Sequence, residues 1–235
     1  MNFISRSSLA FYCLLTFSIL PLLSVAQSTS DEIAKYREMI ADGNPSELYE
    51  MAGEELWKKP AGPKNTSLEQ CDLGLGPGVV DGAAARLPKY FKDTNRVQDL
   101  ESRLMTCMET LQGITAQSVI DAKFGAGPKK DMDAIVAYVV TKSKGKKVNV
   151  SVAHPKEKLM YELGKKAFNF QGGPYDFSCA SCHNAPGKRI RLQDLPNLTT
   201  QEGAIVGWGY WPAYRVSSGQ FWTMQQRIND CLRQQ

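Results

Sequence analysis

The residues best suited to chemistry lie in one short stretch of the chain, Cys179-Ala180-Ser181-Cys182-His183. Two cysteines three positions apart, followed directly by a histidine, are the attachment signature of a c-type haem. In such a site each thiol forms a thioether with a vinyl group of the haem, and the histidine supplies the proximal nitrogen ligand of the iron. The spacing therefore predicts that Cys179, Cys182 and His183 hold one covalently bound haem c.

Other uses of a C-x-x-C pair fit the rest of the chain less well. A zinc site needs four ligands, but the chain has only two histidines, His154 and His183, and no second C-x-x-C. A thioredoxin-like redox pair is expected at the start of a helix that follows a strand. Here the pair follows residues 172–177, where glycines and a proline predict a loop. We therefore interpret the motif as a haem site.

The iron of a bound haem has a second axial position, for which the chain offers several side chains. His154 has the context of a surface residue, and Met160 lies at a spacing typical of core methionines. Met224 is a better candidate because it follows the motif, and Cys231 is a further possibility. Arg227 precedes Cys231 by about one helical turn, so its guanidinium can lie near the sulfur and favour the thiolate. The residues alone leave both Met224 and Cys231 as candidates.

The elements that position these residues are predicted to be helices, so the fold class is mainly α. Apolar residues at helical spacing, with N-cap, acidic, glycine and proline signals at several ends, predict helices over residues 30–40, 46–57, 98–112, 131–141, 157–168 and 220–232. Residues 148–152 alternate valine with polar residues, which predicts a short strand. On the last helix, the face that points to the haem is expected to carry Phe221, Met224, Ile228 and Cys231.

Part of the chain recurs after 124 positions. Four residues are identical across this interval: Pro88 and Pro212, Tyr90 and Tyr214, Arg103 and Arg227, and Cys107 and Cys231. Apolar positions also coincide in the two helices that contain the paired arginine and cysteine. We infer a duplication into two cytochrome c-like domains, residues 27–147 and 148–235. The first domain has no C-x-x-C-H, so it is expected to lack a haem.

The cysteine count fits this organisation. Of the six cysteines, one lies in the amino-terminal apolar segment and two belong to the motif. Cys71, Cys107 and Cys231 remain, and an oxidising compartment pairs two of three such thiols. Cys71 stands alone in the half that lacks a haem motif, where Cys107 also lies. We therefore predict a disulfide between Cys71 and Cys107, which leaves Cys231 unpaired.

The amino-terminal segment has the pattern of a signal peptide. Arg6 is the only charged residue before Asp31, an apolar run covers residues 9–23, and Ser24-Val25-Ala26 resembles a cleavage site. The run is short for a membrane span and contains Pro21, so residues 1–26 are expected to be removed. No other segment is long and apolar enough to cross a bilayer. Covalent haem attachment in bacteria takes place outside the cytoplasm, so we predict a periplasmic protein without a membrane span.

Charge adds little to the functional argument. The formal net charge is +4, and the basic residues are scattered except for one cluster at residues 142–147. This cluster has the composition of a solvated linker rather than of a nucleic-acid site, although it can help to steer an acidic protein partner. We expect no nucleic-acid partner.

Several segments together resemble the SoxA family of sulfur-oxidation cytochromes. They are residues 71–78, 87–91, 99–107, 179–183, 212–215 and 226–231. The resemblance implies an L-cysteine S-thiosulfotransferase subunit that pairs with a smaller cytochrome, SoxX. The reaction that it implies couples thiosulfate oxidatively to a cysteine of the carrier protein SoxYZ and passes electrons to a c-type cytochrome.

The resemblance also implies roles for particular residues. A family cysteine at the position of Cys231 is the distal haem ligand and the reactive sulfur, and an arginine at the position of Arg227 holds the anionic substrate. Some members carry two haems, whereas this chain resembles the one-haem type with a disulfide in its first domain. The alternative functions are a plain periplasmic electron-transfer cytochrome and a haem-based sensor or scaffold.

Overall fold

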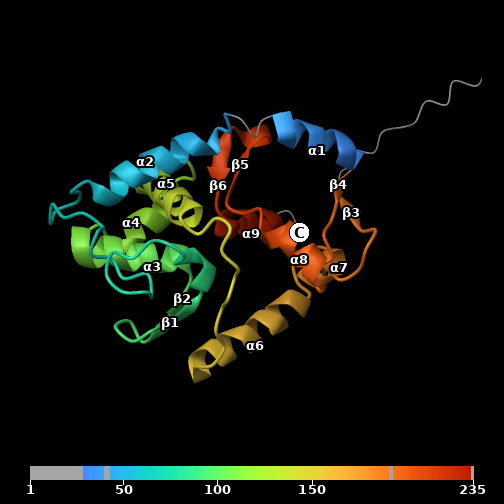
Figure 1. Ribbon diagram of the computed structural model, residues 1–235. Coiled ribbons are helices and arrows are strands. Elements are labelled where there is room, and N and C mark those ends of the chain that lie inside the picture. Colours follow the sequence, from blue (N-terminus) through green and yellow to red (C-terminus); the bar gives the residue numbers. More distant parts are fainter. Residues whose placement is uncertain (1–28, 40–42, 191–192, 234–235) are drawn as a thin grey trace, which may run out of the picture.

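The computed structural model describes residues 29–39, 43–190 and 193–233 of the chain (Figure 1). Within these ranges the α-helices are α1 (Thr29–Met39), α2 (Ser46–Lys58), α3 (Leu100–Cys107), α4 (Ala116–Asp121), α5 (Gly127–Thr141), α6 (Pro155–Asn169), α7 (Cys179–His183), α8 (Gln201–Trp208) and α9 (Met224–Arg233). Shorter helical segments are η1 (Ala84–Arg86), η2 (Met108–Gln112) and η3 (Val216–Ser218). The predicted signal peptide, residues 1–26, lies outside the described residues.

The strands of the described ranges are short and form three antiparallel hairpins. Their bounds are β1 (Lys89–Phe91) paired with β2 (Arg96–Gln98), β3 (Arg189–Ile190) with β4 (Gln193–Asp194), and β5 (Ala213–Arg215) with β6 (Gln220–Trp222). The fold is therefore mainly α, as the sequence predicts.

The hydrophobic core of the described residues lies in the amino-terminal half, where α2, α3 and α5 pack together. Trp57 of α2, Leu104 of α3 and Val139 of α5 are buried in this one cluster. At Gly53 of α2, an added Cβ would lie 1.9 Å from the backbone oxygen of Ala134 on α5. The two helices therefore cross at a distance that a side chain at residue 53 would prevent.

The linker between α5 and α6 differs from the prediction. Residues 148–152 do not form a strand, and the backbone N–H of Asn149 donates to the carbonyl of Ala85 at 2.8 Å. Val148 and Val152 are exposed. A single hydrogen bond does not pair two strands, so the segment with the alternating valines remains a connection without regular structure (yellow in Figure 1).

The start of α6 is fastened to the β1–β2 hairpin. The imidazole of His154 stacks on the ring of Tyr90 with centroids 3.8 Å apart, and its Nδ1 accepts from the backbone N–H of Lys156 at 3.2 Å. The carboxylate of Glu157 accepts from the backbone N–H of Tyr90 at 2.8 Å. These contacts fix the direction in which the chain leaves the first half.

The predicted helix over residues 220–232 is correct only from Met224 onward. Residues 220–222 instead form β6, which pairs with β5. The hydroxyl of Thr223 accepts from the backbone N–H of Gln226 at 3.2 Å and so starts α9. The ring of Phe221 stacks on Tyr49 of α2 at 5.1 Å, so it packs against the first half and does not belong to the expected haem-facing surface of the last helix.

The hairpin-then-helix arrangement occurs twice with the same register. Lys89 pairs with Gln98 before α3, and Ala213 pairs with Trp222 before α9. The second pair lies 124 positions after the first, which is the interval of the sequence repeat. The arginine and cysteine of each repeat therefore lie on equivalent helices.

The turn that precedes Cys71 and the turn that precedes Cys182 also correspond to each other, at an interval of 111 positions. Ala61 forms an isolated bridge with Thr66, and Gly172 forms one with Phe177. Within these turns Asn65 has φ 46° and Asp176 has φ 55°, a left-handed conformation that Asn and Asp tolerate. Continuing along both segments sets Cys71 equivalent to Cys182.

Candidate functional site

The haem motif forms a single-turn helix, α7, whose start is fixed by two serines. The Oγ of Ser178 accepts from the backbone N–H of Ser181 at 3.1 Å, and the Oγ of Ser181 accepts from the backbone N–H of Ser178 at 3.0 Å. This reciprocal capping satisfies N–H groups at the start of the helix. Cys179 and Cys182 then lie on neighbouring positions of one helical face, with Cys179 exposed and Cys182 half-buried.

The ring of His183 is oriented by the backbone. Its Nδ1 lies 2.8 Å from the carbonyl oxygen of Pro196, and the backbone N–H of Leu198 donates to the carbonyl of His183 at 2.9 Å. Because a carbonyl only accepts, Nδ1 carries the proton and Nε2 keeps its lone pair. This is the tautomer in which Nε2 can bind iron.

Cys231 is half-buried on α9 and has a free thiol, as do Cys179 and Cys182. Burial raises the pKa of the Cys231 thiol, and the nearby thiol of Cys179 also raises it, while Arg227 and Arg215 lower it. Arg227 therefore favours the thiolate of Cys231, as its position on the helix predicts, but desolvation by burial is the larger effect and the net shift of this pKa is upward. A thiol that coordinates a metal ion is deprotonated by the metal.

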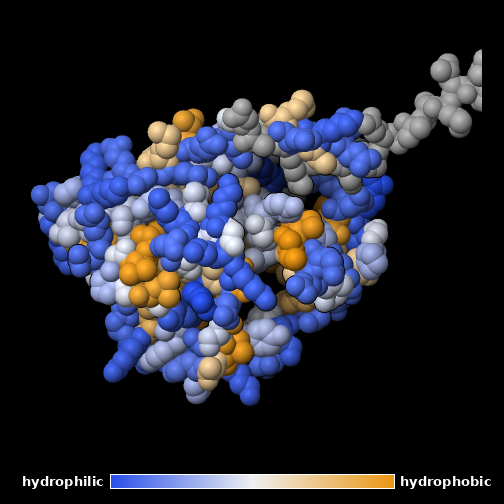
Figure 2. Space-filling view, viewed as in Figure 1, coloured by the Kyte–Doolittle hydropathy of each residue, from blue (hydrophilic) through white to orange (hydrophobic). Residues whose placement is uncertain are grey.

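The donors and their surroundings fit a haem. Two free thiols and an imidazole with an available Nε2 lie on α7, and the thiol of Cys231 is close enough to interact electrostatically with Cys179. Among the described residues after 140, the apolar side chains that are buried are Ala180 and Phe221. Apolar side chains on α6, α8 and α9 are exposed instead, namely Leu159, Leu163, Ile205, Val206, Ile228 and Leu232. Figure 2 shows apolar surface over the regions of α6 and α8. A porphyrin is a large apolar group that such side chains can cover.

The other candidates for the sixth iron ligand are placed differently. His154 is engaged with Tyr90 and caps α6, and Met160 is half exposed on the same helix. Met224 opens α9 and is partly buried, two turns before Cys231. Of these candidates, Cys231 lies near enough to Cys179 for the two thiols to interact electrostatically.

Arg227 lies beside Asp230 and Cys231, as its position on the helix predicts. Its Nη1 is 3.4 Å from Oδ2 of Asp230, and its guanidinium carbon is 5.9 Å from the centre of the Trp211 ring. Sequence reasoning missed Arg215, whose Nη1 lies 3.7 Å from the same Asp230 oxygen.

Cys71 and Cys107 form a disulfide with their Cα atoms 5.6 Å apart, the pairing expected from the cysteine count. Both residues are buried in the core cluster of the first half. The interval of 111 positions makes Cys71 equivalent to Cys182, and the interval of 124 positions makes Cys107 equivalent to Cys231.

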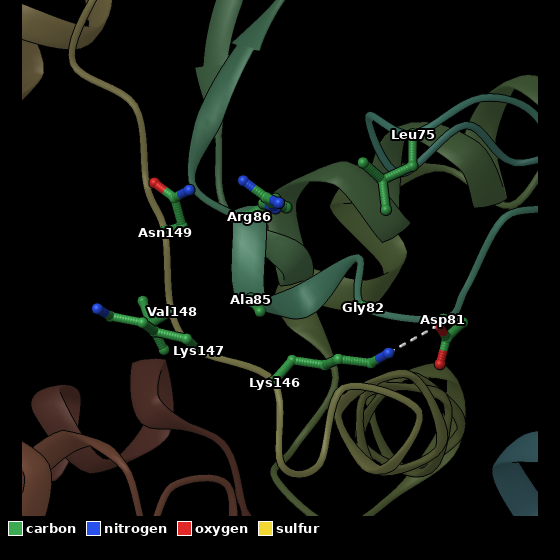
Figure 3. A pocket seen from close by; sticks show the side chains of 9 residues that line it. All are labelled: Leu75, Asp81, Gly82, Ala85, Arg86, Lys146, Lys147, Val148 and Asn149. Carbon is green, nitrogen blue, oxygen red and sulfur yellow. Dashed lines mark ion pairs between the residues drawn. The ribbon is translucent and has the colours of Figure 1, made fainter.

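A cavity of about 590 Å³ lies elsewhere, between η1 and the linker that follows α5 (Figure 3). Lys146 extends along it to Asp81, with 3.3 Å between Nζ and Oδ2, and Arg86 and Lys147 also line it. Neither α7 nor α9 contributes a lining residue. We therefore place the chemistry at the cysteines and not in this cavity.

No helix within the described ranges is long and apolar enough to span a membrane.

The fold and the Cys-Cys-His set define a c-type cytochrome. Residues 52–148 match the family model described as SoxA/TsdA, cytochrome c domain. The chain is 67% identical over 203 residues to the L-cysteine S-thiosulfotransferase subunit SoxA of Hydrogenophilus thermoluteolus, covering 86% of this chain and 74% of that one. A SoxA subunit of Hydrogenobacter thermophilus is 35% identical over 91% of this chain and 79% of its own length. The chain therefore belongs to the SoxA family of L-cysteine S-thiosulfotransferase subunits.

A solved structure supports the fold. The crystal structure of SoxXA from P. pantotrophus matches with a TM-score of 0.68 and 22% sequence identity, over 85% of this chain and 70% of that one. At this identity the match supports the arrangement of elements and not the roles of particular residues.

Proposed function

We propose that this chain catalyses the oxidative coupling of thiosulfate to a cysteine of a SoxYZ-like carrier protein. The observation that carries the proposal is that the free thiol of Cys231 on α9 lies near enough to Cys179 of the haem-attachment motif to interact with it electrostatically, with Arg227 on the same helix. Membership of the SoxA family supplies the reaction. Cys231 is the reactive sulfur and the distal iron ligand, and Arg227 holds the anionic substrate.

The reaction balances as a two-electron oxidation. The carrier thiol and the thiosulfate dianion form a sulfur–sulfur bond, giving a cysteine S-thiosulfonate, one proton and two electrons. Two nucleophilic sulfurs do not join without an oxidant, and the haem supplies one-electron acceptance when it is bound. The second electron requires a further acceptor, for which we propose the haem of a SoxX-like partner and then an electron-accepting cytochrome c.

The side chains of this chain have separate parts in that reaction. The guanidinium of Arg227 binds the thiosulfate anion by charge and by its fork of N–H donors. The proton of the Cys231 thiol, which burial favours, must leave before the sulfur can act as a nucleophile or a ligand. The carbonyl of Pro196 holds His183 in the tautomer that leaves Nε2 for iron.

We further propose the organisation of the mature protein. Residues 1–26 are a signal peptide, residues 27–147 a cytochrome c-like domain without haem, and residues 148–235 the domain that carries one covalent haem c. The protein acts in the periplasm beside its SoxX-like partner. The recurrence of the hairpin and helix supports the two domains, and the single C-x-x-C-H supports a single haem.

The test is a turnover assay with thiosulfate, the carrier protein and the partner cytochrome. Wild-type protein should form the S-thiosulfonate, detected by mass spectrometry of the carrier, and Cys231→Ala should retain covalent haem but lose the product. Substitution of the exposed Met160 by Leu is the matched control and should change neither. Electron transfer without any product would favour the plain electron-transfer cytochrome instead.

A further inference from the structure

Two guanidinium groups, not one, lie beside Cys231. Oδ2 of Asp230 is 3.4 Å from Nη1 of Arg227 on α9 and 3.7 Å from Nη1 of Arg215 at the end of β5. All three side chains are half-buried, with 28% of Arg227, 33% of Arg215 and 19% of Asp230 exposed. One carboxylate thus faces two cations next to the reactive thiol, and the cluster has a net positive charge.

The flat face of each guanidinium also lies beside a tryptophan ring. The guanidinium carbon of Arg215 lies 4.5 Å from the centre of the Trp222 ring, and that of Arg227 lies 5.9 Å from the centre of the Trp211 ring. The Nε of Arg215 also donates to Ser217 at 3.3 Å. A ring contact orients a guanidinium without using its N–H donors, so donors of both groups stay available to an anion.

The first half of the chain has an arginine at the equivalent position, in a domain that lacks the haem motif. Arg103, the equivalent of Arg227, has its side chain only 6% exposed, with Nη1 2.7 Å from Oδ2 of Asp93. Its Nε donates to the carbonyl of Asp72 at 2.6 Å, and its guanidinium lies 4.0 Å above the ring of Phe91. Its contacts are those of a structural arginine.

Two of the groups that hold Arg103 are replaced in the second half. Asp93 becomes Ser217 and Phe91 becomes Arg215, each 124 positions later. The first replacement removes a negative charge beside the arginine, and the second adds a positive one. Both changes act in the same direction, turning a neutralised arginine into part of a cationic pair.

We propose that Arg215 is a second anion-binding residue of the site, which holds the thiosulfate dianion together with Arg227. This inference rests on the proposed function of the site. The dianion replaces the carboxylate of Asp230 as the partner of the two guanidiniums, and each negative charge then faces one cation. Arg215 and Arg227 both lower the pKa of Cys231, which agrees with the presence of both cations near the sulfur.

The test compares haem-loaded variants in complex with the partner cytochrome. Arg215→Gln should raise the KM for thiosulfate about tenfold, the loss of one charge-assisted contact, with a smaller effect on kcat. Arg215→Lys should recover part of the loss, because the charge returns without the fork. The control is Arg96→Gln on β2, which removes the same charge from the hairpin of the first half and should leave KM unchanged.

A second variant tests the cluster from the opposite side. Ser217→Asp restores the carboxylate that occupies this position in the first half, and it should weaken thiosulfate binding, while Ser217→Asn of the same size should not. Calorimetric titration with thiosulfate, and with sulfate as an unreactive dianion, measures binding separately from turnover. If Arg215→Gln fails to load haem, the Ser217 pair decides the question.

The outcomes separate the two proposals. Suppose that the wild-type protein has no coupling activity, but Arg215→Gln or Ser217→Asp weakens its binding of thiosulfate. This result would refute the proposed function and support the anion-binding site. Normal coupling with thiosulfate affinity unchanged in both variants would overturn the role of Arg215 and leave the proposed function intact.

Discussion

Glu101 of α3 gives the sharpest stability prediction, because it is a buried acid at the contact between the two halves. Its side chain accepts from the backbone N–H of Gln225 at 3.4 Å, and the residue is 8% exposed. Burial raises the pKa of Glu101 from its ordinary value of 4.5 to about 8, and the carboxylate of Asp99 adds to the shift. The carboxylate of Asp133 on α5 adds a smaller upward effect on the pKa of Glu101, and burial raises the pKa of Asp133 itself to about 7.

The direction of the pH effect follows from proton counting. Below pH 4.5 the acid is protonated in both states, and between 4.5 and 8 only the unfolded chain loses the proton. The free energy of unfolding therefore falls as the pH rises through this window. The difference between a pKa of 4.5 in the unfolded chain and about 8 in the folded protein corresponds to on the order of 5 kcal/mol. Asp133 acts in the same direction.

The variant Glu101→Gln replaces the protonated acid by a neutral amide of the same shape. We expect it to be more stable than wild type at pH 9 and similar at pH 5, so that its stability depends less on pH. Urea unfolding followed by circular dichroism at pH 5, 7 and 9 measures the difference. Glu109→Gln, an exposed glutamate on η2, is the control for simple loss of charge. Equal pH slopes for wild type and Glu101→Gln would refute the reasoning.

Three further predictions concern packing, the disulfide and the iron ligand. Gly53→Ala should destabilise the protein by about 3 kcal/mol or more in urea unfolding, because its Cβ would overlap the Ala134 backbone. Gly164→Ala on α6, where no atom lies within 4 Å of the new Cβ, should be neutral or stabilising. Cys71→Ala with Cys107→Ala should cost about 2–4 kcal/mol in the same assay and leave haem attachment intact. Cys231→Met should keep the covalent haem, raise its reduction potential in a spectroelectrochemical titration and abolish coupling. An unchanged potential would remove Cys231 from the iron.

The haem motif and most of the helices were predictable because their signals are local, whereas α4 and α8 were not predicted. Apolar spacing located α2, α5 and α6 within a few residues, and the C-x-x-C-H spacing located α7. The hairpins were not predictable in the same way, since strands of two or three residues are too short to show alternation. Their pairing depends on the turn between them and on the helix that follows.

The site was predicted only in part, because one of its two arginines can be located from helical spacing and the other depends on strand pairing. Arg227 was found from its spacing to Cys231 on one helix. Arg215 approaches from a strand, and only the pairing of β5 with β6 brings it to Asp230. The interval of 111 positions was missed because the second half has 13 more residues between Cys182 and Pro212 than the first has between Cys71 and Pro88. The longer segment of the second half contains α8 and the β3–β4 hairpin.

The two halves stabilise one arrangement of elements by different bonds. In the first half the cysteines at equivalent positions, Cys71 and Cys107, are joined directly and lie within a buried apolar cluster. In the second half, Cys182 and Cys231 are both free, and apolar side chains around them remain exposed. If the proposed haem were bound, Cys182 would hold it through a thioether and Cys231 would ligate its iron, so the cofactor would link the positions that a disulfide links in the first half. Under this proposal the first half supports α9 through the contact of Glu101 with Gln225, and the second half keeps Cys231 available for sulfur chemistry.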